Sequence, residues 1–531
     1  MICLNNVSMP LSYTEEQLKE AAAKKLKISV KDISQFSICK RSIDARRGTV
    51  SFIFSLYVEV LLDEKRLVTS CKDGCAKLVN MEPYSYLEAR KNKDSHPVVV
   101  GSGPAGLFAA LVLAESGLQP IVFERGQDVE TRVKSVKEFN LTGVLNPESN
   151  IQFGEGGAGT FSDGKLNTGI HNSRIRFVLE QFAKFADASD VLWQAKPHVG
   201  TDRLCVFVKK LREYLISLGT TFSFDTKVCD IVVKNNQLQG LVIMQKGKTS
   251  VFDCQNAIFA IGHSARDTFQ MLFDKGLLME QKPFAVGVRI EHKRESIDKA
   301  RYGSFAGSPQ LGAADYRLAV HPKNGRGVYT FCMCPGGRVV AAASEENMVV
   351  TNGMSLYARE EENSNSAVLV GVSSEDYPSS NPLAGVILQQ TIEKRAFVDG
   401  GGAYQAPCQM VGDFLEGKPS KSFKTVKPSY ERGVRPSNIE NCLPKPVCDS
   451  LKIGIPMMGK QITGFDHKEA LLTGVESRTS SPVRLLRRDD GQSCIEGIYP
   501  SGEGAGYAGG IVSSAVDGMK SAELLIQNFY Q

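Results

Sequence analysis

The chain has 531 residues, enough for roughly two to four domains. Hydrophobic residues make up 42% of it and charged residues 23%, which is typical of a soluble globular protein, and a net charge of +5 is too small to indicate nucleic-acid binding by itself. No run of about eighteen apolar residues occurs, and the first residues lack a basic region followed by a long apolar core. We therefore expect a cytoplasmic protein without a membrane span or a secretion signal.

Thirteen cysteines, an odd number, are scattered along the chain, which suits free thiols in a reducing compartment. Cys71 and Cys75, like Cys332 and Cys334, are close in sequence, but neither pair has a matching Cys or His pair at zinc-site spacing, so we expect no metal. We interpret these thiols as buried or incidental. A redox-active pair at Cys332 and Cys334 is the alternative.

The N-terminal part of the chain is expected to form a small α+β domain. A capping box at Thr14 and Gln17 opens a helix over 15–26. Residues 36–47 and 49–61 read as strands, and the second has apolar residues at every other position. The order strand, helix, strand, strand indicates a ferredoxin-like fold.

Positive charge gathers in this part of the chain. Residues 1–95 hold sixteen Lys or Arg against twelve Asp or Glu, with a cluster at Lys40, Arg41, Arg46 and Arg47. We interpret the cluster as a solvated basic face, because no aromatic and basic RNA-binding signature accompanies it, and an RNA- or partner-binding surface is the alternative. Residues 88–95 are charged without apolar spacing and read as a linker or a short helix.

The stretch from residue 97 to residue 126 carries the most specific motif. A run of three valines indicates a strand buried on both faces, and G-x-G-x-x-G follows at Gly101, Gly103 and Gly106. These glycines permit a tight turn, close approach of the backbone to a diphosphate, and close packing of the next helix on the sheet. A second strand ends at Glu124, at the spacing of a carboxylate that accepts hydrogen bonds from ribose. The motif predicts a dinucleotide-binding fold.

A second glycine-rich stretch, residues 150–169, repeats G-x-G-x-x-G, but no β-branched strand precedes it and no helical pattern follows. We expect a loop laid against a ligand, with backbone N–H groups as donors and with charge from Asp163 and Lys165. Beyond it we expect helices over 175–186 and 201–218 and a β-meander with a final buried strand over 221–260.

Residues 282–475 alternate strand-like runs with polar loops, which indicates an inserted substrate domain on a mixed or antiparallel sheet. Arg289 and His292 follow one of these runs, and a buried arginine there would need an anionic partner. Arg478 lies in a short polar loop. These three residues are candidate contacts for an acidic or carbonyl-bearing substrate; an internal salt bridge or a cap is the alternative for each.

The last part of the chain, residues 497–531, begins with a short strand and a run of glycines that would let the backbone wrap a ligand. A helix is expected to start near Ile511. The N–H groups of its first turn would favour a negative group just beyond Gly510.

Three separated pieces resemble the FAD-dependent oxidoreductases of the glutathione-reductase-like superfamily: VVVGSGPAG with FERG, AIFAIGHSAR, and GIYPSGEGAGYAGGI. The blocks QFGEGGAGTFSDGKL, KPFAVGVRIEH, YTFCMCPGGRVV and TGVESRTSSPVR are similar to those of bacterial and plant proteins called FAD-dependent dehydrogenase or NAD(P)/FAD-dependent oxidoreductase. The resemblance implies an α/β fold: a small N-terminal α+β domain (1–95) and a three-layer (ββα) Rossmann-like FAD-binding domain (96–281 and 476–531) that an inserted mixed-sheet substrate domain (282–475) divides.

The resemblance and the glycine loops also imply the residues that bind FAD. The helix near Ile511 would face the N1–C2=O edge of the flavin, and His263 would lie near the cofactor or be a satisfied loop histidine. No residue stands out as a catalytic acid or base. The implied FAD-binding residues are Gly101, Gly103, Pro104, Ala105, Gly106, Glu124, Arg125, Arg132, Gly157, Gly159, Thr160, Lys165, Val228, Gly262, Gly502, Glu503, Gly509, Gly510 and Ile511.

The sequence thus predicts an FAD-dependent dehydrogenase or reductase that holds FAD non-covalently and acts on a small molecule. No second strand, G-x-G-x-x-G and helix unit occurs, so NADH or NADPH would bind only transiently as the electron donor. Two alternatives stay open: a flavin-stabilised RNA- or partner-binding protein that uses the basic N-terminal domain, and an NAD(P)H-dependent flavin monooxygenase. No pattern indicates the oligomeric state.

Overall fold

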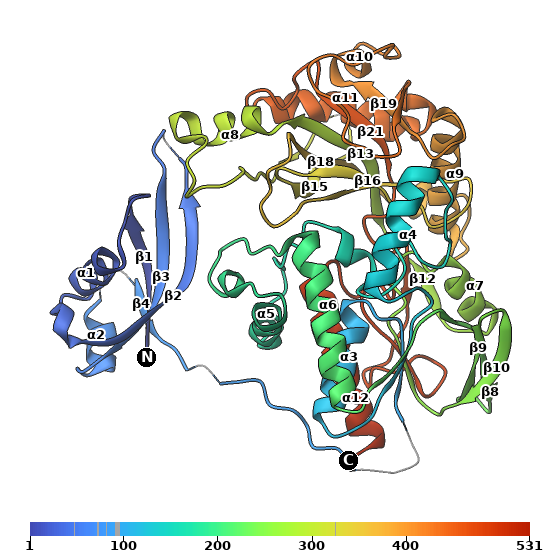
Figure 1. Ribbon diagram of the computed structural model, residues 1–531, viewed down its shortest axis with the longest axis horizontal. Helices are drawn as coiled ribbons and strands as arrows, with labels where there is room; N and C mark the ends of the chain where they lie inside the picture. The colour runs from blue at the N-terminus through green and yellow to red at the C-terminus, as the bar shows by residue number, and fades with distance from the viewer. Residues whose placement is uncertain (47, 72–73, 81, 91–95, 324) are drawn as a thin grey trace.

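The computed structural model describes residues 1–531 except 47, 72–73, 81, 91–95 and 324. Figure 1 shows three bodies. A small N-terminal domain (1–78) lies to the left, a central domain (97–278 and 486–531) lies below, and an inserted domain (279–485) lies above it.

The N-terminal domain is a four-stranded antiparallel sheet with two helices. Its elements are β1 Ile2–Met9, α1 Glu15–Leu26, β2 Ile33–Asp44, β3 Ser51–Val60, α2 Glu64–Ser70 and β4 Ala76–Leu78. The strand order β2-β3-β1-β4 is that of a ferredoxin-like fold, as predicted. The predicted capping box is present, because the Gln17 N–H donates to Thr14 Oγ1 at 3.3 Å and the Thr14 N–H donates to Gln17 Oε1 at 3.0 Å.

Strand β2 docks the N-terminal domain onto the central domain. The Arg41 N–H donates to the Trp193 carbonyl at 2.6 Å, and the Ala195 N–H donates to the Arg41 carbonyl at 2.9 Å. The Arg41 guanidinium lies 4.5 Å from the Trp193 ring and 4.8 Å from the Phe52 ring. The domain contact therefore uses one member of the predicted basic cluster.

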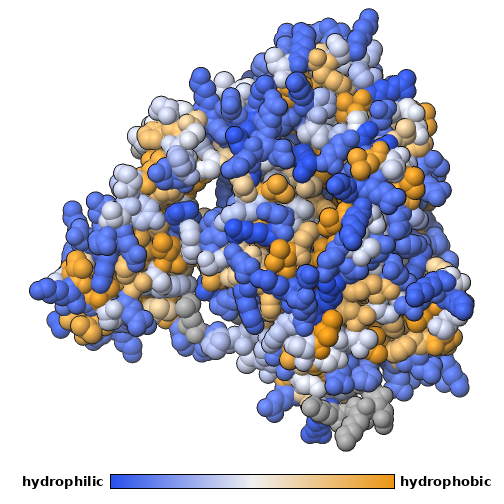
Figure 2. All heavy atoms as spheres, viewed as in Figure 1, coloured by the Kyte–Doolittle hydropathy of each residue, from blue (hydrophilic) through white to orange (hydrophobic). Residues whose placement is uncertain are grey.

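Of the other members of this cluster, Lys40 lies on β2 and Arg46 follows the end of that strand. Arg46 pairs with Asp44 at 2.7 Å, and Arg47 lies outside the described residues. Figure 2 shows that the N-terminal domain projects to one side of the molecule, with an opening between it and the rest. An RNA- or partner-binding role for its surface stays a prediction.

Residues 82–90 lead from the N-terminal domain along the central domain. The Tyr84 hydroxyl donates to Glu523 at 2.7 Å, and the rings of Tyr84 and Tyr86 contact the Phe177 ring. Residues 88–90 are not helical, so the described part of the predicted linker or short helix is a linker; residues 91–95 lie outside the described residues.

A five-stranded parallel sheet forms the middle of the central domain. Its strands are β5 Val98–Val100, β6 Ile121–Phe123, β7 Thr221–Ser223, β11 Ala257–Phe259 and β23 Ile498–Pro500. The order β23-β11-β5-β6-β7 puts the valine strand at the centre, and its side chains are at most 6% exposed. This confirms a strand buried on both faces.

Alternation along β5 separates two cores. Val99 packs with Ile258 and Tyr499 against the helices, whereas Val98 and Val100 pack against the antiparallel meander. The sheet, helices and meander form the predicted three layers, so the fold-class prediction is confirmed. The helices are α3 Pro104–Glu115, α5 Arg174–Phe185, α6 Gly200–Ser217 and α12 Ile511–Phe529, and the meander is β8 Thr226–Lys234, β9 Gln237–Gln245 and β10 Lys248–Asp253.

The inserted domain is built on a seven-stranded sheet. In spatial order its strands are β14 Ala319–Val320, β15 Val328–Cys334, β18 Asn363–Val372, β13 Phe284–Lys293, β21 Leu471–Glu476, β19 Ala406–Met410 and β20 Val434–Pro436. Only the β19–β20 pair of this sheet is parallel, as expected for a mixed sheet.

Further elements complete the central and inserted domains. They are α4 Val129–Thr142, α7 Arg266–Asp274, β12 Met279–Gln281, α8 Arg294–Tyr302, β16 Arg338–Ala341, β17 Thr351–Met354, α9 Ala384–Asp399, α10 Val411–Leu415, α11 Lys445–Gly459 and β22 Val483–Leu485. Strands β12 and β22 pair where the chain leaves and re-enters the central domain. Within the described part of the chain, every helix is too short or too polar to cross a membrane.

Helices α3 and α12 are far apart in the sequence, near the beginning and at the end of the central domain, but their backbones nearly touch in space. A Cβ added at Gly518 would lie 2.0 Å from the Ala105 carbonyl oxygen. The absence of a side chain at Gly518 therefore lets the C-terminal helix lie against the helix that follows the first glycine motif.

We expect Gly518→Ala to lower the free energy of unfolding by about 1–3 kcal/mol. Alanine favours a helix by up to about 1 kcal/mol over glycine, but a methyl group cannot fit at this distance from a backbone oxygen, so the packing cost dominates. Thermal unfolding measures the difference. Gly371→Ala on β18, where an added Cβ meets nothing within 4 Å, is the control and should change stability by about 0.5 kcal/mol or less. Equal stability of the two variants would contradict the close packing.

Candidate functional site

A cavity of about 1190 Å³ lies between the central sheet and the inserted sheet. One wall is formed by the loops at the carboxyl ends of β5, β6, β11 and β23, where open α/β sheets bind ligands. The opposite wall comes from β13, β15 and the polar loop after β21. The volume is sufficient for a dinucleotide with a small molecule beside it.

The first glycine motif turns the chain at the edge of this cavity. Gly101 has a φ of 99°, and a Cβ there would lie 2.4 Å from the Ala260 carbonyl oxygen. A Cβ at Gly106 would lie 1.9 Å from the Gly101 carbonyl oxygen. Gly103, Pro104 and Ala105 line the cavity at the start of α3, whose unpaired N–H groups favour an anionic ligand.

Glu124 lines the cavity at the end of β6, but its carboxylate already accepts hydrogen bonds from four donors of the protein. Oε2 accepts from the Ser102 N–H at 2.8 Å and the Ser102 hydroxyl at 2.7 Å, and Oε1 accepts from the N–H groups of Gly126 at 2.9 Å and Gly154 at 3.1 Å. Four donors match the roughly four lone-pair sites of a carboxylate. In this structure Glu124 joins three loops; the ribose contact stays a prediction.

Arg125 also lines the cavity. It pairs with Glu148 at 2.7 Å and with Asp267 at 2.9 Å, and its guanidinium lies 4.1 Å from the Phe153 ring. Its charge is therefore balanced within the protein, while its side chain forms part of the wall. Val228 lines the same wall from β8.

The second glycine-rich stretch lies beside the first. Gly157, Gly159 and Lys165 line the cavity, and a Cβ at Gly157 would lie 3.1 Å from the Cα of Gly103. Their contact with FAD stays a prediction. The stretch forms a short 3₁₀ turn, Gly157–Phe161, rather than a second dinucleotide-binding helix. The Lys165 ammonium donates to the Met333 carbonyl, which ties this loop to β15.

Arg132 and Thr160 differ from the prediction, because neither is among the residues that line the cavity. Arg132 is fully buried, and its guanidinium donates to the carbonyls of Asn150, Ile151, Gly154 and Glu155. The Thr160 hydroxyl donates to the Glu155 carbonyl at 3.2 Å. Both side chains donate their hydrogen bonds to carbonyl groups of the glycine-rich loop. They therefore stabilise the loop rather than face the cavity.

The C-terminal glycines complete the wall. Glu503, Gly509, Gly510 and Ile511 line the cavity, whereas the Gly502 N–H is turned to Asp517 at 2.7 Å. Helix α12 begins at Ile511, as predicted. Burial raises the pKa of Glu503 to about 7, against the effect of the Lys282 charge.

Three of the lining glycines leave space for a ligand. A Cβ added at Gly262, Gly509 or Gly510 meets no protein atom within 4 Å, although all three positions lie on the cavity wall. A diphosphate-linked cofactor such as FAD fits this arrangement, because the same cavity meets the N-termini of two helices.

The three predicted substrate contacts are not brought together. Arg289 is 0% exposed and donates to Asn365 Oδ1 at 2.6 Å, and it does not line the cavity. His292 points the other way and bonds the Phe465 carbonyl at 2.7 Å, because side chains three positions apart on β13 project from opposite faces. Arg289 and His292 thus have hydrogen-bond partners within the protein, which is the alternative to a substrate contact. Arg478 does line the cavity.

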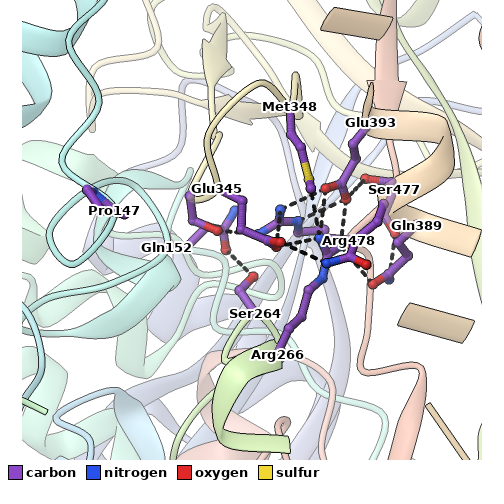
Figure 3. A network of polar contacts seen from close by, with 12 residues as sticks. Pro147, Gln152, Ser264, Arg266, Glu345, Met348, Gln389, Glu393, Ser477 and Arg478 are labelled. Atoms are coloured by element: carbon purple, nitrogen blue, oxygen red, sulfur yellow. Dashed lines mark hydrogen bonds and ion pairs between the residues drawn. The ribbon is translucent and has the colours of Figure 1, made fainter. Parts of the chain in front are cut away.

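Arg478 belongs to a buried network of charges (Figure 3). Arg478 Nη2 and Arg266 Nη2 donate to the two oxygens of Glu393, at 2.8 Å and 2.7 Å, and Glu393 is 0% exposed. The two guanidinium charges hold the pKa of Glu393 far below its usual range, despite the opposing effect of burial. Ser477 and Gln389 add hydrogen bonds. The sequence gives no signal for Glu393, which lies in the middle of helix α9.

His263 lies near this network and, like Arg478, lines the cavity. Burial and the nearby charges of Arg478 and Arg266 lower the pKa of His263 to about 4, so the ring is neutral at pH 7. Its Nε2 atom has no hydrogen-bond partner among the described residues. The structure thus places His263 on the cavity wall, and its proximity to the cofactor stays a prediction.

Three family descriptions match parts of the chain. Residues 283–479 match "FAD-dependent protein, C-terminal domain-like", residues 96–136 match "FAD binding domain", and residues 1–59 match a "Domain of unknown function". Together with the cavity, these matches define the class of the protein: it is an FAD-dependent oxidoreductase whose cofactor is FAD.

The particular family follows from a full-length relative. The chain is 46% identical over 537 residues to a protein of Clostridium beijerinckii described as "Uncharacterized protein", and the match covers 99% of each chain. The chain belongs to the same family as this protein.

Solved structures of several flavoenzymes are similar to this chain. A geranylgeranyl bacteriochlorophyll reductase-like protein from Thermoplasma acidophilum is 12% identical, with 81% of this chain and 78% of that chain covered and a TM-score of 0.37. Glycine oxidase from Bacillus cereus is 12% identical, with 82% and 98% covered and a TM-score of 0.33. A mutant of the halogenase PltM in complex with FAD is 10% identical, with 82% and 70% covered and a TM-score of 0.37.

We expect Glu393→Ala to lower the free energy of unfolding by about 3–5 kcal/mol, because it leaves two buried guanidinium groups without their shared carboxylate. Denaturant unfolding measures the loss. Glu180→Ala, which breaks the exposed Arg176–Glu180 pair, is the control and should cost about 0.5 kcal/mol or less. A loss of the same size in both variants would contradict the central role of Glu393.

We expect Gly509→Leu to lower the affinity for FAD at least about tenfold, which is about 1.4 kcal/mol of binding free energy. The new side chain fills space on the cavity wall where no protein atom stands, so the fold should survive. The visible absorbance per protein and the melting temperature report the two effects separately. Gly371→Leu, outside the cavity, should keep its flavin. Full FAD content in Gly509→Leu would contradict the assignment of this wall.

Proposed function

We propose that the protein is a dehydrogenase or reductase that holds FAD non-covalently and exchanges electrons with a small molecule. Within the FAD-dependent oxidoreductases we infer a glutathione-reductase-like arrangement, which the three-layer central domain and the return of α12 to the first glycine motif support. The observation that carries the proposal is the shared cavity, since one wall suits a dinucleotide and the opposite wall belongs to another domain. Cofactor and substrate would meet inside it.

When bound, FAD supplies the two-electron chemistry, and the chain supplies binding, orientation and charge. The turn at Gly101 and Gly103 and the start of α3 would hold the diphosphate through backbone N–H groups and the helix dipole. Helix α12 would direct its first N–H groups, from Ile511 onward, toward the N1–C2=O edge of the flavin and stabilise negative charge there.

The inserted domain would supply the substrate side. Tyr316, Tyr329 and Phe331 give this wall an aromatic surface, and Arg317 and His321 are exposed beside it. Arg478 contributes little free charge, because Glu393 and Glu345 together balance Arg478 and Arg266. We therefore propose an acidic or carbonyl-bearing small molecule, which the positive charge at the cavity would attract.

NADH or NADPH would act as a transient electron donor. Among the described residues, the second G-x-G-x-x-G stretch forms part of the cavity wall and not a second nucleotide-binding unit. A nicotinamide would therefore enter the same cavity as the substrate, and the two would bind in turn.

We expect the purified protein to be yellow and to release its FAD into solution on acid precipitation, because the contacts inferred here are non-covalent. Anaerobic NADH or NADPH should then bleach the visible flavin absorbance. The Gly509→Leu variant serves as the flavin-depleted control. A colourless protein that takes up no FAD, or flavin that stays with the precipitate, would contradict the proposal.

The same measurements separate the two alternatives. Oxygen uptake coupled to incorporation of oxygen into a substrate would favour a flavin monooxygenase. Salt-sensitive RNA binding by the intact protein, without any reduction of the flavin by nicotinamides, would favour an RNA-binding protein that FAD merely stabilises.

A further inference from the structure

Cys332 and Cys334 lie one behind the other at the cavity wall. Cys332 is part of the lining, and Cys334 behind it is 0% exposed. The register of β15 against β18 shifts between Phe331 and Cys334, and Cys332 has a φ of 42°. A positive φ is uncommon for any residue but glycine, and a bulge of this kind redirects side chains. The strand is thus locally bent at the two cysteines.

The bend brings the Cys334 side chain against the backbone of Cys332. The Cys334 thiol donates to the Cys332 carbonyl at 3.3 Å. Arg289 donates to the same carbonyl at 2.8 Å and approaches the Cys334 sulfur at 3.5 Å. A disulfide requires the two sulfur atoms to approach to about 2.05 Å, and here both thiols belong to one short bend of a single strand.

Nearby charges make the two thiols unequal. The hydrogen bond from Cys334, together with the charges of Arg289 and Lys165, lowers the pKa of Cys332, despite its burial. Burial raises the pKa of Cys334 well above its ordinary value. One thiolate beside one thiol is the arrangement that thiol–disulfide chemistry requires.

Glu476 supplies a second observation at this place. It is 4% exposed, lines the cavity, and pairs with Arg289 at 3.3 Å through Oε1. Its Oε2 atom has no hydrogen-bond partner within the described part of the chain. A buried polar oxygen without a partner on a cavity wall indicates a site for another group. Burial raises the pKa of Glu476 to about 7, so its carboxyl can give or take a proton at neutral pH.

We propose that Cys332 and Cys334 form a redox-active pair that exchanges two electrons with the FAD in the same cavity. On oxidation, a bond forms between the two sulfurs, the Cys334 S–H bond breaks, and two electrons pass to FAD. Cys334 releases its proton at the same time, so the pair gives up two electrons and one proton, the equivalent of a hydride, and no further proton is needed. The reverse reaction restores the thiolate and the thiol. The inference rests on the proposed function and deepens it, because the pair would store electrons between cofactor and substrate.

The test is an anaerobic dithionite titration of the air-oxidised holoenzyme, followed by its flavin absorbance. We expect four electrons per bound FAD, two for the flavin and two for the disulfide. Cys332→Ser and Cys334→Ser should each take up two. Cys408→Ser is the matched control, since Cys408 is equally buried in the same sheet on β19, and it should still take up four.

A mass measurement on the unaltered protein keeps the test independent of the variants. Cleavage after Arg326 and Arg338 releases a peptide, residues 327–338, that contains these two cysteines and no other. Before reduction it should resist alkylation and be lighter by two hydrogens; after reduction it should take two alkyl groups. An uptake of two electrons with both thiols open to alkylation would overturn the inference. Dithionite needs no nicotinamide, so this outcome is distinct from failure of NADH or NADPH to reduce the flavin.

Discussion

The contact between the backbones of α3 and α12 is the constraint on which the rest of the binding wall depends. Gly518 lets the C-terminal helix lie against the Ala105 carbonyl, so the N-termini of both helices meet one cavity. Two dipoles of the same sign face the same space, and this is favourable only when that space holds negative charge. In the proposed function, the diphosphate of FAD would supply that charge.

Most of the buried arginines near this cavity already have hydrogen-bond or ion-pair partners within the protein. Arg132 donates to loop carbonyls, and Arg289 binds Asn365 and Glu476. Arg266 and Arg478 pair with Glu393 and Glu345. A buried cation is tolerated only with partners, and each of these is supplied by a different segment of the chain. The arginines therefore fix loops and sheets in place, and most contacts left for a cofactor come from the backbone.

The sequence predicted the features that depend on local patterns. The valine strand, the first glycine turn, the capping box at Thr14 and the start of α12 at Ile511 were all found where spacing and residue type put them. These features arise from steric freedom and hydrogen bonding within a few residues, so a short window of sequence contains their cause.

Partners that are distant in sequence could not be predicted in this way. Arg289 carries a pattern that suits a substrate contact, but Asn365 and Glu476, which neutralise and bind it, come from other strands of the sheet. Glu393 gives no signal at all, because a single acid in a helix is usually exposed. Which charge a chain buries is decided by the packing of whole elements.

The docking of the N-terminal domain gives the protein a built-in optical reporter. Trp193 is the single tryptophan of the chain, and it stands at the junction under the Arg41 guanidinium. Its emission arises wholly from this interface, since no other indole contributes. Any separation of the two domains would change the surroundings of that one ring, so the fluorescence of the unlabelled protein follows their association directly.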